Sequence, residues 1–141
     1  MKPLLIMAAL AALPVSAQAR NMENMMTVKA LPGGGQEFEV LNHPGSGPQD
    51  YWCAAGAYAQ RDLGLGPFDR IYLVQGRAPA QTRPGWQAVT FTTDSQHPVV
   101  AMLPDGGKSD LFLSLTKKGY ALSSDSARQY CFDGVDIELI P

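Results

Sequence analysis

The chain has 141 residues, of which 45% are hydrophobic and 17% charged, and its formal net charge at pH 7 is −2. This length is that of one domain, and the weak acidic balance offers no basic patch for nucleic acid or for a membrane surface. We therefore expect no nucleic-acid partner.

Residues 1–19 have the features of a secretory signal peptide in their usual order. A positive charge at Lys2 precedes an unbroken apolar stretch, a helix-breaking proline and a small-x-small cleavage motif that ends at Ala19. The apolar stretch is too short to span a membrane, and Arg20 stands where a lipid-anchored protein would carry a cysteine. We expect cleavage after Ala19 and a single domain over residues 20–141, periplasmic or secreted, with no membrane span.

The chain contains two cysteines, Cys53 and Cys131, which allow one intramolecular pairing. Exported proteins fold in an oxidising compartment, where a disulfide is the expected state of such a pair. The Cys53–Cys131 disulfide is expected to contribute about 2–4 kcal/mol to the free energy of unfolding.

The first part of the domain predicts an irregular segment and a β-hairpin. Residues 20–27 carry three methionines and no periodic pattern, which indicates an irregular lead-in. Apolar residues then alternate over 27–31 and again over 36–41, and a glycine cluster lies between the two runs. Alternating runs around glycines are typical of two strands joined by a turn.

A loop over 42–48 leads into the main helix, which is predicted to end near Leu63. Two starting positions are possible for this helix. Ser46 and Gln49 form a capping box at the earlier one, and Asp50 caps the later one. Small residues share the helix face of Trp52, which predicts close packing against a sheet.

The second half of the chain predicts strands followed by a short helix. The strands are expected at 70–75, 87–93, 98–103, 111–116, 119–122 and 135–140, with 111–116 and 119–122 forming a hairpin. Ser123 is expected to cap a short helix through Tyr130. The fold class is α+β: a largely antiparallel sheet with one main helix packed on it, a short C-terminal helix and one disulfide.

An enzymatic alternative starts from Cys53. A cysteine near a helix start with a later histidine, here His97, resembles the arrangement of cell-wall cysteine peptidases of the NlpC/P60 kind. The resemblance implies a thiolate nucleophile at Cys53 and a general base at His97. Cys131 offers Cys53 another partner, and a disulfide between the two would remove the Cys53 thiolate that this alternative needs.

Other chemistry finds no support in the residue pattern. Neither His43 nor His97 has a partner at metal-ligand spacing, and no nucleotide-binding or cofactor motif is present. We expect no metal and no cofactor. Glu37 and Glu39 share one strand face and are interpreted as solvated charges. The same interpretation is given to the arginines between residues 61 and 83, which are Arg61, Arg70, Arg77 and Arg83.

The best candidate for a binding site is the loop before the main helix together with the first helical turn. Its glycines, Gly47 among them, allow close backbone approach, and the helix start offers N–H groups to an anion. Tyr51 adds an amphipathic ring and is the leading contact residue. His43 and Ser46 complete the predicted site.

Residues 45–77 and 127–131 resemble small exported proteins of alphaproteobacteria that carry one cysteine pair and have no assigned activity. The resemblance implies export and the cysteine pairing, and it implies no catalytic residue.

These patterns favour a non-enzymatic binding or interaction module of the cell envelope, whose partner is an envelope protein or a small ligand. Two alternatives remain: a cysteine hydrolase that uses Cys53 and His97, and an inhibitor of a periplasmic enzyme that presents one rigid loop.

Overall fold

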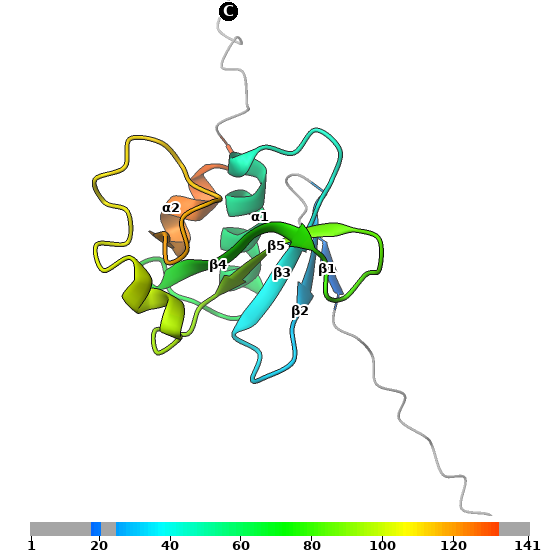
Figure 1. Ribbon diagram of the computed structural model, residues 1–141, viewed down its shortest axis with the longest axis horizontal. Helices are drawn as coiled ribbons and strands as arrows, with labels where there is room; N and C mark the ends of the chain where they lie inside the picture. The colour runs from blue at the N-terminus through cyan, green and yellow to red at the C-terminus, as the bar shows by residue number, and fades with distance from the viewer. Residues whose placement is uncertain (1–17, 21–24, 133–141) are drawn as a thin grey trace, which may run out of the picture.

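The structure, a computed structural model, describes the backbone of residues 18–20 and the whole of residues 25–132 (Figure 1). The predicted strand at 135–140 lies outside these ranges. The described elements, in chain order, are β1 (Gln18–Arg20), β2 (Thr27–Ala30), β3 (Glu37–Leu41), α1 (Pro48–Arg61), β4 (Arg70–Pro79), β5 (Gln87–Thr92), the 3-10 helix η1 (Pro98–Met102), β6 (Ala121–Ser123) and α2 (Ser124–Gln129). Within the described ranges, no helix has the length and hydropathy needed to cross a membrane.

The strands form one antiparallel sheet in the order β1-β2-β3-β5-β4-β6. The predicted hairpin is confirmed as β2 and β3, with Val28 opposite Val40 in the core. The α+β fold, with its main helix, short C-terminal helix and antiparallel sheet, is confirmed as well. Of the predicted irregular lead-in over 20–27, Met25 and Met26 lie outside any strand, whereas Arg20 belongs to β1 and Thr27 to β2. Residues 21–24 lie outside the described ranges.

Helix α1 begins between the two predicted starts. Gly47 is its N-cap, and the Asp50 carboxylate accepts a hydrogen bond from the Gly47 N–H at 2.8 Å. The predicted Ser46–Gln49 capping box is therefore wrong. The Ser46 hydroxyl instead donates to the carbonyl oxygen of His43, which closes the preceding loop.

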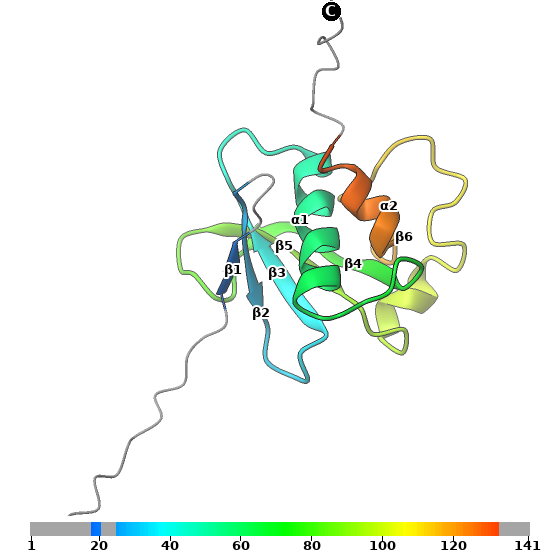
Figure 2. The ribbon, with the colours of Figure 1, turned by 180° about the vertical axis from the view of Figure 1, so that it is seen from behind.

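Helix α1 is covered by the sheet and by α2. In Figure 2 the sheet lies behind α1 and α2 lies beside it, and every residue from Tyr51 to Ala59 is buried. A Cβ atom at Gly56 would lie 2.6 Å from the backbone nitrogen of Arg128, so only glycine allows α2 this close. The predicted disulfide between Cys53 and Cys131 is confirmed, and it ties α1 to the end of α2.

The core between the sheet and α1 is aromatic. The Trp52 ring makes edge contacts with Phe91 and Tyr120, at centroid distances of 4.8 and 5.6 Å. Its indole N–H donates to the carbonyl oxygen of Ser114 at 2.9 Å. This bond fastens the long loop before β6 to the centre of the helix layer, because a buried indole N–H needs an acceptor.

Two predicted strands are replaced by other structures. Residues 98–102 form η1, because Pro98 starts a helical turn and the His97 ring accepts from the Val99 N–H at 3.1 Å. Residues 111–116 form no strand, so the predicted hairpin with 119–122 is wrong. The Ser114 hydroxyl accepts the N–H groups of Thr116 and Lys117, which makes a turn instead of a ladder.

Candidate functional site

Tyr51, the predicted leading contact, lies in the core with none of its surface exposed. Its hydroxyl donates to the side-chain oxygen of Asn42, and the Arg77 guanidinium lies 5.1 Å from the centre of its ring. The sequence predicts Tyr51 as a contact residue for a ligand or partner. Arg77 and the loop before α1 cover the Tyr51 ring, so it has no surface to offer a partner.

The other predicted binding residues hold the loop together. His43 is exposed, Ser46 bonds back to it, and the Ser46 carbonyl oxygen accepts from the Arg77 side chain at 2.9 Å. The Gly47 N–H, which was expected to face an anion, already donates to Asp50. The carboxylate of Asp50 therefore already occupies the place that an anion was expected to take at the helix start.

The two residues of the hydrolase alternative have structural partners. Cys53 is bonded to Cys131 and only 1% exposed, so it presents no thiol. His97 caps η1 through one ring nitrogen, and its other nitrogen lies 3.8 Å from a carboxylate oxygen of Glu37.

The interpretation of Glu39 as a solvated charge is wrong. Its side chain is 1% exposed, and its carboxylate accepts the N–H groups of Gln81 and Thr82 at 3.0 and 2.8 Å. The Thr82 hydroxyl donates to it too. A buried carboxylate with three donors holds the β4–β5 loop onto the sheet. In the described ranges, no three His, Cys, Asp or Glu side chains are grouped as metal ligands.

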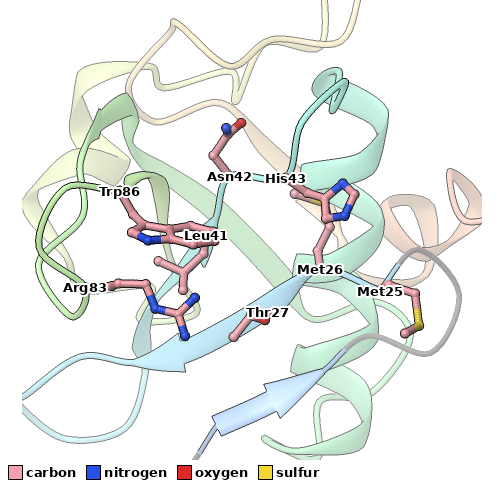
Figure 3. Close-up of a pocket in the computed structure, with 8 residues that line it drawn as sticks. All are labelled: Met25, Met26, Thr27, Leu41, Asn42, His43, Arg83 and Trp86. Carbon is pink, nitrogen blue, oxygen red and sulfur yellow. The ribbon is translucent and has the colours of Figure 1, made fainter.

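Two hollows flank the loop before α1. The first, which we call the Trp86 pocket, has a volume of about 240 Å³ (Figure 3). It is lined by Met25, Met26, Thr27, Leu41, Asn42, His43, Arg83 and Trp86. The Arg83 guanidinium lies 4.5 Å from the centre of the Trp86 ring, so one aromatic face is already covered by a cation.

The second hollow, which we call the Phe112 groove, has a volume of about 380 Å³ and lies between Pro48, Arg77 and residues 110–117. Two adjacent apolar side chains stand at its rim. Leu111 is 92% exposed and Phe112 is 84% exposed. An exposed pair of large apolar side chains beside a groove is the kind of surface that marks a contact site for another molecule.

The loop that carries this pair, residues 105–118, is fixed at its base. The Gly107 N–H donates to the Asp105 carboxylate at 3.0 Å, and this bond holds the pKa of Asp105 below its ordinary value. The Lys117 ammonium lies 2.7 Å from a carboxylate oxygen of Asp110. Gly107 has a φ of +83°, and a Cβ atom there would lie 2.5 Å from the Tyr120 ring. We call this segment the Phe112 loop.

The sequence does not predict a site at the Phe112 loop. It predicts a strand over 111–116, in which Leu111 and Leu113 would share one face. The signal that could have found it is the unbroken run from Leu111 to Leu113, since a strand covered on one face shows alternation.

Of the four arginines interpreted as solvated charges, Arg61, Arg70 and Arg77 are exposed and Arg83 is half-buried. Arg77 stacks on Tyr51, Arg83 stacks on Trp86, and Arg70 lines a further hollow beside β6. Each cation covers a different part of the molecule.

Comparisons of the chain with models of protein families, with curated proteins and with solved structures gave no match.

Proposed function

We propose that this protein is an exported, non-enzymatic interaction module of the cell envelope that binds a partner protein through the Phe112 loop. The observation that carries the proposal is the exposure of Leu111 and Phe112 side by side at the rim of the Phe112 groove. Water contact with two large apolar side chains is unfavourable, and a partner that covers them gains their burial.

The fixed base of the loop supports this role. Hydrogen bonds of Asp105 and Ser114, together with the Asp110–Lys117 ion pair, hold both ends of the segment. A loop that is ordered before binding loses less conformational entropy when a partner closes on it. The adjoining groove gives the partner a place for a side chain of its own.

The export part of the proposal is supported by the signal-peptide pattern of residues 1–19 and by the disulfide. A cross-link between Cys53 and Cys131 is characteristic of proteins that fold in an oxidising compartment.

The inhibitor of a periplasmic enzyme is a second candidate, and one observation favours it. A single projecting loop with an apolar tip and a fixed base fits the concave active-site cleft of an enzyme. The cysteine hydrolase gains no such support, because Cys53 is held in the disulfide.

Photo-crosslinking of partners in the native periplasm tests the proposal, with the wild type, Phe112→Ser and Phe68→Ser compared. Phe68 is 89% exposed in the loop between α1 and β4, so it is a matched control for losing one exposed phenylalanine. We expect capture of the partner to fall at least about tenfold for Phe112→Ser and to persist for Phe68→Ser. Equal capture by all three proteins would refute the proposed site. For the inhibitor candidate, the captured partner is an enzyme whose activity the wild-type protein lowers.

A further inference from the structure

The strand at one edge of the sheet, β1, would lose most of its residues in the proposed export. β1 consists of Gln18, Ala19 and Arg20, and it covers the outer edge of β2. Cleavage after Ala19 removes two of these three residues. In the processed chain, β2 therefore becomes the edge strand. This step rests on the export part of the proposed function.

The β2 edge is built to pair with an antiparallel strand. In the structure, Gln18 lies opposite Lys29, Ala19 opposite Val28, and Arg20 opposite Thr27. Once β1 is removed, the backbone groups that faced it lose their partners. Such an edge is a template for another extended segment, and proteins rarely leave one open.

The sequence of β2 itself matches the strand that it loses. Read along the chain, β1 has a polar, an apolar and a cationic residue (Gln18-Ala19-Arg20), and β2 has the same order in Thr27-Val28-Lys29. A second copy of β2, laid antiparallel with its Val28 opposite Val28, puts its Thr27 opposite Lys29. Each position then keeps the class of residue that β1 had there.

We infer that two processed chains pair through their β2 edges, so that their sheets join into one continuous sheet about a two-fold axis at Val28. Such an axis stands perpendicular to the sheet and keeps both α1 helices on the same face. The contact is isologous, which is the usual form of a two-fold dimer. Val28 belongs to the core, and its partner on the second copy extends that core across the axis.

The dimer leaves the Phe112 loops free. This loop leads into β6, at the end of the sheet opposite β2, and Figures 1 and 2 both place it far from β1 and β2. Two copies joined at β2 therefore present two Phe112 loops at the two outer ends. A partner with two binding sites at a matching distance would be held by avidity.

The test uses protein purified from the periplasm in its processed form. Its intact mass gives the N-terminal residue, and sedimentation equilibrium over a wide concentration range gives the dimer dissociation constant. Thr27→Lys places a lysine opposite Lys29 of the second copy twice per dimer, and Thr27→Glu places a glutamate there. Opposed like charges weaken a strand pair and opposite charges strengthen it, so we expect the constant to rise about tenfold for Thr27→Lys and to fall for Thr27→Glu.

Ser95→Lys is the matched control, because it adds the same charge at an exposed turn outside β2 and is expected to leave the dissociation constant unchanged. A protein that begins at Arg20, dimerises and responds to the two Thr27 variants in opposite directions supports the inference. A monomer at every concentration, a dimer that ignores both variants, or an edge filled by a different polypeptide overturns it. A chain that retains residues 1–19 overturns it together with export, whereas binding through Phe112 is measured separately by the crosslinking experiment.

Discussion

Two aromatic side chains, Tyr51 and Phe112, lie in different regions of the molecule. The sequence suggests that Tyr51 is exposed and Phe112 is not, and the structure shows the reverse. Tyr51 follows a loop rich in glycine and proline and is fully buried, whereas Phe112 lies within an apolar run and is 84% exposed. Both lie near the same groove, since Arg77 stacks on Tyr51 and also lines the Phe112 groove. One ring belongs to the core and the other stands at the rim.

The difference between the two regions comes from what covers each segment. Helix α1 is enclosed on a second side by α2, by the loop before it and by Arg77, so its outward side chains are buried too. The Phe112 loop pairs the N–H groups of Gly107, Thr116 and Lys117 with its own side chains, Asp105 and Ser114. Such local bonds fold the two ends of the segment into turns and not into a sheet ladder, and its apolar side chains face outward.

The largest expected effect is that of Tyr51→Ala. Removing a fully buried aromatic side chain leaves a cavity, and we expect the free energy of unfolding to fall by about 3–5 kcal/mol. Urea unfolding followed by tryptophan fluorescence measures it. Tyr51→Phe removes only the hydrogen bond to Asn42 and should cost about 0.5–1.5 kcal/mol. If Tyr51→Ala were nearly neutral, the ring would not be the core residue that the structure describes.

Removal of the disulfide comes next. In the double variant Cys53→Ala, Cys131→Ala, α2 loses its covalent tie to α1, and the unfolded chain gains the freedom of a loop whose ends are 78 positions apart. We expect a loss of about 2–4 kcal/mol in the free energy of unfolding. Wild-type protein kept reduced during urea unfolding serves as the control and should match the variant. A double variant as stable as the oxidised wild type would show that the enclosure of α1 does not depend on this bond.

Phe112→Ser sharpens the comparison from the exposed side. Because the ring is largely in contact with water, its loss should change the free energy of unfolding by no more than about 0.5 kcal/mol. The same urea experiment measures it, and the variant is the one expected to lose partner binding. A destabilisation as large as that of Tyr51→Ala would place Phe112 in the core and remove the binding proposal with it.

The smallest expected effect concerns the base of the Phe112 loop. The Gly107 N–H holds the pKa of Asp105 below its ordinary value of 3.8. A carboxyl with a lowered pKa stabilises the folded chain fully above its unfolded-state pKa, and the contribution is lost as the pH falls through the folded-state pKa. We expect amide exchange at Gly107 to quicken as the pH falls below about 4, after correction for the intrinsic pH dependence of exchange.

Asp105→Asn is the matched variant for this prediction, because its amide oxygen can still accept the Gly107 N–H but does not titrate. The corrected exchange rate of Gly107 should then show no step in this pH range. A step of equal size in both proteins would assign the effect to another carboxyl group.

The sequence by itself determined the local parts of this fold. Alternation around a glycine cluster predicts the β2–β3 hairpin, small residues at helical spacing predict α1, and Ser123 predicts the start of α2, where its hydroxyl accepts from the Ser126 N–H. The disulfide is predicted from two cysteines together with the expectation of export. Each of these patterns depends on a few neighbouring residues or on composition, so one sequence is enough to recognise it.

The tertiary structure alone decided the site. Trp52 fastens the Phe112 loop through Ser114, which is 62 positions away, and Glu39 fastens the β4–β5 loop through Thr82, 43 positions away. These partners are brought together by the sheet order and by the packing of α1, and no local pattern encodes which distant carbonyl or carboxylate a group will meet. The exposure of a side chain is set by the same distant neighbours, which is why the sequence identified the elements but assigned Tyr51 to the surface and Phe112 to a strand.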